Sequence, residues 1–360
     1  MSYIVPIGPY HPALEEPVHA RLYTEGEEIK SAEVFIGYNH RGIEKLAMQK
    51  NFIQTITLVE RVCGICSHSH ALAYALCLEE IAGVQVPKRG QYMRVIVEEL
   101  ERLHSHYLWL GIALHLVGHD SLFMHTWDDR EAIMDMLEEL TGNRVNYGIV
   151  TFGGSRRDIT DTQIQDLRDM LDKIEQSMLR LKDILLSDKT VALRTQGVGV
   201  LTTEDALRIG AVGPHARASN LAMDVRKDAP YSSYEDFDFD VAVWPSCDVF
   251  SRVVIRVLEN FSSISIIRQA LDKLPKGPVN LGNKIPKIPA GEYMIRHEAP
   301  RGQLTYKVVT DGGETNKRLS IHVPTFRNAP TVPTMLKGNS VADAGLIIAS
   351  IDPCFSCMDR

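Results

Sequence analysis

Residues 96–114 read IVEELERLHSHYLWLGIAL, and this stretch sets the expected architecture. Its apolar side chains recur at alternating spacings of four and three residues, at Ile96, Leu100, Leu103, Tyr107, Leu110 and Leu114. Positions with this spacing lie on one face of an α-helix, because the helix completes a turn about every 3.6 residues. The pattern follows Pro87 and predicts a long helix with one face in the protein core.

Two further segments have the same character. Residues 164–185 keep the apolar spacing over about six turns, and Thr160 or Asp161 can cap the start of that helix. Another helix is expected from Phe250 to Leu274, ending before Pro275. Long helices with short connections predict a helix bundle at the centre of the protein.

Strand signals lie toward the two ends of the chain. Residues 18–38 alternate around Gly26 and predict an N-terminal β-hairpin. The Pro- and Gly-rich residues 273–293 predict a loop, followed by short strands over 293–299 and 303–311 and an apolar, final helical segment over 342–351. The expected fold class is therefore mainly α with smaller α+β parts, in one domain of residues 1–360. Its parts are an N-terminal hairpin region (1–60), a helical bundle (61–275) and C-terminal strands with a metal-binding tail (276–360).

Composition excludes several classes of protein. The chain of 360 residues is 44% hydrophobic and 24% charged, which is typical of a globular protein with a substantial core. Its net charge of −7 disfavours a nucleic-acid partner. The apolar stretch 106–119 is shorter than the ~20 residues that span a bilayer, and the N-terminus lacks the pattern of a secretory signal. We therefore expect a cytoplasmic protein, in which paired cysteines bind metal more often than they form disulfides.

Two cysteine pairs lie near opposite ends of the chain. Each has the C-x-x-C spacing that lets two thiolates converge on one metal: Cys63 with Cys66, and Cys354 with Cys357. Four soft ligands suit zinc, iron or nickel, so structural zinc, a catalytic metal and a redox pair all remain open. The long separation disfavours a small zinc ribbon, because such a site closes locally. The isolated Cys77 and Cys247 are expected to be buried core thiols.

The residues around these pairs resemble a known family. RVCGICSHSH (61–70) and DPCFSCMDR (352–360) are similar to the two signature motifs of NiFe-hydrogenase large subunits, R-x-C-G-x-C-x-x-x-H and D-P-C-x-x-C-x-x-H/R. Five further stretches look like the energy-converting, membrane-bound branch (Ech/CO-induced type) and the related quinone-site 49 kDa-type subunit of complex I: GYNHRGIEK, FGGSRRDIT, GPHARASN, CDVFSRVVIRVLE and EAPRGQLTY. The resemblance extends from Gly8 to Arg360.

This resemblance implies a catalytic subunit for the reversible oxidation of H2. The complex I subunits of the superfamily have lost the cysteines, whereas this chain has all four. By resemblance, nickel is held by all four thiolates in a Ni-Fe centre. Cys66 and Cys357 also bridge to an iron that carries CO and cyanide ligands. His70 is then a hydrogen-bonding neighbour of a cysteine sulfur or of the iron ligands; the plainer alternative is a structural core histidine.

The resemblance also implies roles for residues that bind no metal. Arg301 would lie over the open metal position, where a fixed cation can polarise dihydrogen, and Asp352 would pair with it. Pro324 and Thr325, in HVPTF, would contact the cyanides.

A proton must also leave the site. Glu15 in HPALEEP corresponds to the family's proton-relaying glutamate, with Glu16 as the alternative register and a solvated acidic pair as the plain reading. Glu44 matches a carboxylate that in many relatives binds magnesium near the C-terminus. Because Arg360 replaces the usual terminal histidine, magnesium is doubtful and a Glu44–Arg360 ion pair is expected instead.

The remaining expectations concern other histidines and the partners. His104, His106, His115 and His119 are expected to be core or interface residues, because no full ligand set accompanies them. The family implies a small subunit carrying a 4Fe–4S cluster, further iron–sulfur and membrane subunits, and a location on the inner face of the cell membrane. A non-catalytic complex I-type scaffold and a structural zinc protein remain as alternatives, which metal analysis separates.

Overall fold

The computed structural model describes residues 2–12, 14, 16–282 and 287–360. Its α-helices are α1 (Ile43–Ala47), α2 (Phe52–Glu60), α3 (Ser67–Ile81), α4 (Lys88–Leu116), α5 (Asp120–Thr141), α6 (Asp161–Ser187), α7 (Lys189–Thr195), α8 (Thr203–Ile209), α9 (Gly213–Arg217), α10 (Val225–Asp228), α11 (Val249–Asp272), α12 (Pro324–Asn328), α13 (Val332–Leu336), α14 (Ala344–Ser350) and α15 (Phe355–Asp359). Its strands are β1 (Ser2–Ile7), β2 (His19–Glu25), β3 (Glu28–Phe35), β4 (Val150–Thr151), β5 (Gly154–Ser155), β6 (Ala290–Ala299), β7 (Gly302–Asp311) and β8 (Arg318–His322). The expectation of a mainly helical protein with small antiparallel sheets toward both ends is confirmed.

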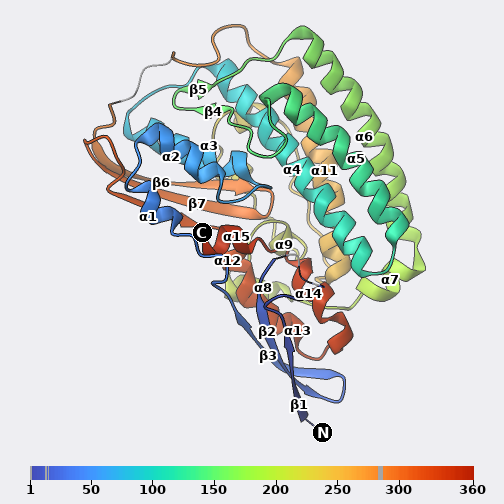
Figure 1. Cartoon of the computed structure of the whole chain (residues 1–360). Coiled ribbons are helices and arrows are strands. Elements are labelled where there is room, and N and C mark those ends of the chain that lie inside the picture. The colour runs from blue at the N-terminus through green and yellow to red at the C-terminus, as the bar shows by residue number, and fades with distance from the viewer. Residues whose placement is uncertain (1, 13, 15, 283–286) are drawn as a thin grey trace.

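Four long helices form the bundle. In Figure 1, α4, α5, α6 and α11 run side by side, and α4 packs against both α5 and α11. Helix α4 buries the predicted apolar row, including Leu100, Leu103 and Leu110. Helix α5 was not anticipated, because its charged residues interrupt the apolar spacing; it buries Ile133 and Leu137.

Two of the predicted helices, α6 and α11, begin with hydrogen-bonded side-chain caps. Thr160 accepts a hydrogen bond from the backbone of Gln163, whose side chain accepts in return from the Thr160 backbone, and so begins α6. Asp248 and Ser251 make the equivalent box at the start of α11, which begins at Val249 and ends at Asp272. The expected span of Phe250–Leu274 is therefore confirmed to within two residues.

Two small antiparallel sheets flank the bundle. The expected hairpin is β2–β3, which turns at Gly26 (φ 61°) with the positive φ that glycine adopts without strain. Strand β1 extends it to a three-stranded sheet that sequence periodicity did not indicate. The second sheet is β6–β7–β8; β6 already begins at Ala290, so strand pairing takes in the end of the expected loop.

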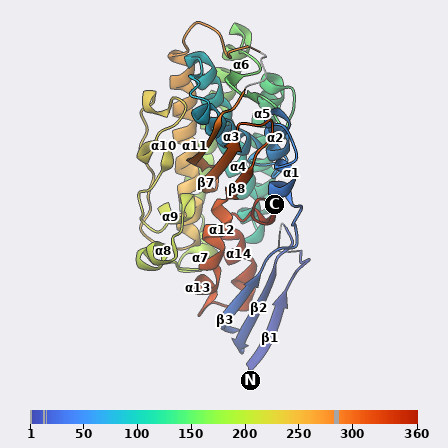
Figure 2. The same cartoon turned by 90° about the vertical axis from the view of Figure 1, so that its left-hand side faces the viewer.

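The C-terminal tail lies between the bundle and the N-terminal sheet (Figures 1 and 2). Helix α14 confirms the expected apolar segment, and α15 brings the C-terminus close to α1 and α12. Residues near both ends of the chain therefore meet at the middle of the molecule.

Candidate metal centre

The two cysteine pairs occupy two loop-to-helix junctions. Cys66 is the N-cap residue of α3, and Cys354 is the N-cap residue of α15. The first pair follows α2, and the second follows α14. All four thiols are buried, with 2–5% of each residue exposed. The fold therefore encloses both pairs in its interior.

The four sulfur atoms meet. The Sγ atoms of Cys66 and Cys357 are 3.4 Å apart, those of Cys63 and Cys354 are 3.4 Å apart, and those of Cys354 and Cys357 are 3.0 Å apart. Two sulfurs bound to one ion at about 2.3 Å each lie at most about 4.6 Å apart, so these separations fit a shared ion. Within the described residues, the group of metal-ligating atoms that all lie within 4.8 Å of one another is formed by Cys63, Cys66 and Cys357, and Cys354 adjoins it through Cys63 and Cys357. The donor set is all thiol and suits a soft metal such as nickel.

The cluster favours negative charge on one sulfur. Hydrogen bonds from Cys354 and the other thiols, together with the charge of Arg301, lower the pKa of the Cys63 thiol well below its usual value. Burial raises the pKa of Cys357. Metal binding requires thiolates, so the cluster can release protons as it takes up a cation.

His70 lies beside the cluster. Its Nε2 is 3.4 Å from Sγ of Cys357, and its Nδ1 is 2.6 Å from the hydroxyl of Tyr306 in β7. Burial lowers the pKa of His70 to about 4, so the ring is neutral at pH 7. The hydrogen bond with Tyr306 orients the His70 ring. Side chains that hydrogen-bond to a metal ligand are usually oriented by a further partner in this way. Sequence patterns gave no sign of Tyr306.

Arg301 and Asp352 form the expected pair. Arg301 lies between β6 and β7; its Nη2 is 2.9 Å from Oδ1 of Asp352, and its Nε donates to the Asp352 carbonyl at 3.0 Å. Its Nη1 donates to Ser105 of α4 at 3.4 Å. Burial opposes the charge, but Asp352 and the neighbouring thiols raise the pKa of Arg301 above its usual value. The guanidinium is therefore a permanent buried cation beside the sulfurs.

Thr325 also lies at the cluster. Its Oγ1 accepts a hydrogen bond from the backbone N–H of Cys354 at 3.0 Å. Pro324 is the first residue of α12 and is buried next to it. The structure therefore brings the HVPTF segment to the second cysteine pair.

Of the two candidate proton relays, Glu15 lies outside the described residues. Glu16 is described, and its carboxylate accepts hydrogen bonds from the backbone N–H groups of Phe355 and Ser356 and from the Ser356 hydroxyl. These two residues separate Cys354 from Cys357. Glu16 is thus hydrogen-bonded to the first turn of α15, directly at the second cysteine pair.

Arg41 is a residue that the sequence interpretation missed. Its Nη2 donates to the carbonyl of Val62 at 2.7 Å and to that of Ser356 at 2.6 Å. One guanidinium therefore joins the turn before Cys63 to the first turn of α15, directly before Cys357. Its place in GYNHRGIEK, a stretch noted for its family resemblance, was the available signal.

The expected ion pair at the C-terminus is confirmed. Arg360 Nε donates to Glu44 Oε1 at 2.9 Å, and Arg318 Nη2 contacts the other carboxylate oxygen at 3.1 Å. The backbone N–H of Ile321 donates to the same carboxylate at 3.0 Å. Because two guanidinium groups and an N–H occupy the carboxylate, these residues do not fit a magnesium ion.

The other candidate residues lie elsewhere. His115 contacts Asp120 at 2.7 Å, whereas His119 faces Asp188 at 3.9 Å, so each histidine has its own carboxylate partner. Cys77 is buried as expected, but Cys247 is only partly buried, so the expectation of a core thiol there was wrong. Cys247 has φ 64° in the turn before α11, where its side chain reaches the Pro245 carbonyl and not the core.

In the described part of the chain, no helix is long and apolar enough to cross a bilayer.

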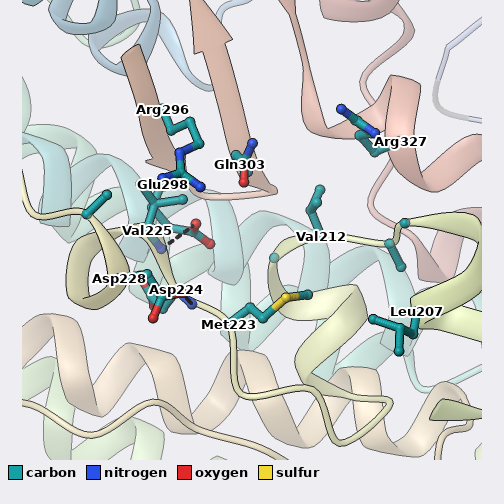
Figure 3. A pocket seen from close by; sticks show the side chains of 14 residues that line it. Leu207, Val212, Met223, Asp224, Val225, Asp228, Arg296, Glu298, Gln303 and Arg327 are labelled. Carbon is teal, nitrogen blue, oxygen red and sulfur yellow. Dashed lines mark hydrogen bonds between the residues drawn. The ribbon is translucent and has the colours of Figure 1, made fainter. Parts of the chain in front are cut away.

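A separate cavity of about 300 Å³ opens beside β6. Figure 3 shows Arg296, Glu298 and Gln303 on one side of it and Met223 and Leu207 on another. Its carboxylate Glu298 is paired with the buried Arg217 at 2.9 Å. None of the four cysteines lines it, so it is distinct from the metal centre.

Comparisons with known proteins agree with this geometry. A family model described as "Nickel-dependent hydrogenase" matches residues 41–122, and one described as "Respiratory-chain NADH dehydrogenase, 49 Kd subunit" matches residues 117–288 and 281–360. The "Carbon monoxide-induced hydrogenase" of Rhodospirillum rubrum is 42% identical over 360 residues, covering 100% of this chain and 99% of the relative. The chain belongs to the large-subunit family of energy-converting NiFe-hydrogenases.

A second relative is also named a hydrogenase, and a chain of a solved respiratory membrane complex has the same fold. The "Membrane-bound hydrogenase subunit alpha" of Pyrococcus furiosus is 40% identical, with 99% of this chain and 87% of the relative covered. A chain from a solved "membrane-bound sulfane sulfur reductase (MBS), an archaeal respiratory membrane complex", superposes with a TM-score of 0.95 at 31% identity, covering 100% and 98% of the two chains. The protein is a catalytic large subunit, an oxidoreductase acting on H2, and its cysteine cluster is compatible with a Ni-Fe site.

Proposed function

We propose that the four thiolates hold nickel, and that Cys66 and Cys357 also bridge to an iron carrying CO and cyanide, in a centre that oxidises H2 reversibly. The convergence of four buried sulfurs from opposite ends of the chain carries this proposal. Such a centre supplies heterolytic splitting of H2 and accepts its electrons.

The protein's own residues prepare the site. The pair with Asp352 holds the Arg301 guanidinium in one orientation, so that a cation faces the place where charge changes. His70 Nε2 hydrogen-bonds with Cys357 Sγ, and the hydrogen bond between His70 Nδ1 and the Tyr306 hydroxyl orients the ring. Thr325, with Pro324 beside it, supplies a polar wall at the second cysteine pair and is our candidate for contacting the cyanides.

Glu16 is the group that we propose moves the proton. Its carboxylate lies against the two residues between Cys354 and Cys357, and it is partly exposed. It can therefore take a proton at the cysteine end and pass it toward solvent. Glu15 remains the alternative at the neighbouring position.

The subunit is proposed to act within a membrane-bound complex. The names of the relatives above support this assembly, as do large apolar side chains exposed near the N-terminus, with Ile4 60% and Tyr10 82% exposed. Electrons would pass to a 4Fe–4S cluster of a small subunit and on to other iron–sulfur subunits. Membrane subunits would hold this chain on the inner face of the cell membrane.

Metal analysis of the purified complex tests the proposal. We expect one nickel per large subunit, together with an iron whose CO and cyanide ligands show in the infrared spectrum. Zinc alone would instead indicate a structural site. A chain without bound metal and without H2 chemistry would be a scaffold of the complex I type.

A further inference from the structure

A series of buried, hydrogen-bonded polar side chains begins at the start of α3, directly after Cys66. It is called the hydrogen-bonded chain below. The carboxyl group of Glu101, on α4, accepts hydrogen bonds from the backbone N–H groups of His68 at 2.6 Å and of Ser69 at 3.0 Å. All three residues are fully buried. A titratable group therefore lies at the helix start that holds the first cysteine pair, away from Glu16.

The Ser69 hydroxyl joins two carboxyl groups. Its Oγ is 2.6 Å from Oε1 of Glu101 and 2.8 Å from Oε1 of Glu98, one turn earlier on α4. A hydroxyl has one proton to donate, so one of these two contacts requires a proton from a carboxylic acid. Burial and the charge of Glu98 raise the pKa of Glu101, which agrees with a protonated Glu101. A proton on the Glu101 carboxyl can therefore reach Glu98 through the Ser69 hydroxyl.

His297 continues the chain. Its Nε2 is 3.0 Å from the same Oε1 of Glu98, and its Nδ1 has no hydrogen-bond partner among the described residues. The other charged or titratable groups that face Glu98 are His68 at 3.8 Å and Arg102 at 3.9 Å. The imidazole can therefore exchange a proton with Glu98 at Nε2, and its Nδ1 is left without a protein partner among the described residues.

The outer end of the chain reaches a second cavity. The His297 ring packs on the Tyr231 ring, with centroids 4.4 Å apart, and Tyr231 lines a cavity of about 380 Å³ together with Glu80, Ser232 and Ile295. Strand alternation places His297 on the same face of β6 as Ile295, which lines this second cavity, whereas Arg296 lines both this cavity and that of Figure 3. His297 is therefore separated from this second cavity by the Tyr231 ring.

The inner end lies at the first turn of α3, the helix whose N-cap residue is Cys66. Tyr147 is buried, and burial raises the pKa of its phenol. Tyr147 also places its hydroxyl 3.0 Å from Nε2 of His104, so a polar group adjoins this end of the chain.

We propose that Glu101, Ser69, Glu98 and His297 form a second proton route, which leads from the start of α3, directly after the first cysteine pair, toward the cavity lined by Tyr231. This inference rests on the proposed function and adds to the route at Glu16. Each hop moves one proton across one hydrogen bond: from the Glu101 carboxyl to Ser69 Oγ as the Ser69 proton moves to Glu98, and then from Glu98 to His297 Nε2 as the Nδ1 proton passes to a solvent water molecule that enters from the cavity at Tyr231. The electrons of H2 stay with the metal centre and its partner subunit.

The test compares two reactions of the same intact complex. Isotope exchange between H2 and D2O needs protons to cross between the metal site and solvent, whereas interconversion of ortho- and para-hydrogen needs only H2 splitting. Their ratio is independent of how much of a variant folds or loads nickel. We expect Glu16→Gln to leave residual exchange, and Glu16→Gln with Glu98→Gln to lower that residual ratio by a further tenfold or so. Glu16→Gln with Ser69→Ala should do the same by removing the bridging hydroxyl.

A buried carboxylate that takes no part in the hydrogen-bonded chain provides the matched control. Glu79 is equally buried but pairs with Arg94 at 2.6 Å, so Glu16→Gln with Glu79→Gln should keep the ratio of Glu16→Gln even if it is less stable. An unchanged ratio in both the Glu98 and the Ser69 double variants would overturn the second route. Absence of ortho–para conversion in the unmodified complex would instead overturn the proposed function.

Infrared spectroscopy gives a readout that needs no turnover. The shared proton predicts the carbonyl band of a protonated carboxylic acid at neutral pH, shifted in D2O. Glu101→Gln should remove this band, and Glu79→Gln should keep it. A band that persists in Glu101→Gln would show that the shared proton is not there.

Discussion

Arg301 and Asp352 hold each other at two points: Nη2 lies 2.9 Å from the carboxylate Oδ1, and Nε donates to the backbone carbonyl at 3.0 Å. Asp352 lies two residues before Cys354 and has φ 54°, an uncommon conformation for a residue other than glycine. The pair therefore joins the β6–β7 turn to the loop that carries the second cysteine pair. It also positions a buried cation beside the sulfurs.

Replacing Arg301 by lysine should keep the metals but remove most activity. A lysine ammonium cannot reproduce the planar guanidinium that contacts both Asp352 and Ser105, so turnover should fall by about a hundredfold or more. H2 oxidation at full nickel occupancy measures this effect. Arg296→Lys, on the exposed part of β6, is the matched control and should keep normal turnover; unchanged turnover in Arg301→Lys would refute the role.

Replacing any one of the four clustered cysteines by serine should abolish nickel binding and H2 chemistry. A hard hydroxyl is a poor substitute for a soft thiolate, and the remaining sulfurs are too few to complete the site. Nickel content per chain is the measurement. Cys247→Ser, outside the cluster, should bind nickel normally, and normal nickel content in a cluster variant would contradict the ligand assignment.

Glu16→Gln should slow proton exit while the metals assemble. Glutamine keeps the shape and can still accept the hydrogen bonds from Phe355 and Ser356, but it cannot carry a proton in the useful range. H2 uptake and H2–D2O exchange should fall by about a hundredfold, and ortho–para conversion should persist. Glu15→Gln is the control and should behave like the unmodified protein; the reverse pattern would assign the relay to Glu15.

Glu44→Gln should loosen the C-terminus. The substitution removes the charge that pairs with Arg360 and Arg318, both within 3.1 Å, and should lower the free energy of unfolding by about 1–3 kcal/mol. Thermal denaturation of the large subunit measures the change. The exposed pair of Glu33 with Arg21 offers the comparison, because Glu33→Gln should change stability by less than about 1 kcal/mol. Equal effects of the two substitutions would count against a structural role for the tail contact.

Glu99 should make stability depend on pH in acid. Burial opposes its charge, but Arg102 and Arg226 outweigh burial and lower the pKa of Glu99 to about 2. Because the unfolded chain binds the proton more readily, the stabilisation from this carboxylate is complete above about pH 4.5 and is lost as the pH falls toward 2. It corresponds to about 3 kcal/mol at neutral pH, by the conversion of about 1.4 kcal/mol per pKa unit. In denaturant titrations from pH 7 downward, Glu99→Gln should show a smaller loss of stability than the unmodified protein, and parallel losses would contradict this.

Local pattern was enough to predict much of the fold. The apolar row of α4 was predicted from residue spacing, and Thr160, the cap of α6, was one of two candidates that residue type suggested. Helix α5 and strand β1 were not predicted, because charged residues interrupt the spacing of α5 and β1 depends on pairing with β2. Such elements are stabilised by their packing partners more than by their own periodicity.

The candidate site, like the fold, was only partly predictable from the sequence. The sequence by itself determined the chemistry of the ligands: four thiols in two C-x-x-C pairs, with a histidine, an arginine and acidic residues nearby in the motifs. Only the tertiary structure decided which groups meet. It brought Sγ of Cys66 to 3.4 Å from Sγ of Cys357 and placed the Glu16 carboxylate against the helical turn between Cys354 and Cys357. It also added Tyr306 and Arg41 to the site. The physical reason is that these contacts join residues hundreds of positions apart, whose approach depends on how the sheets, bundle and tail pack and leaves no periodic signal in the sequence.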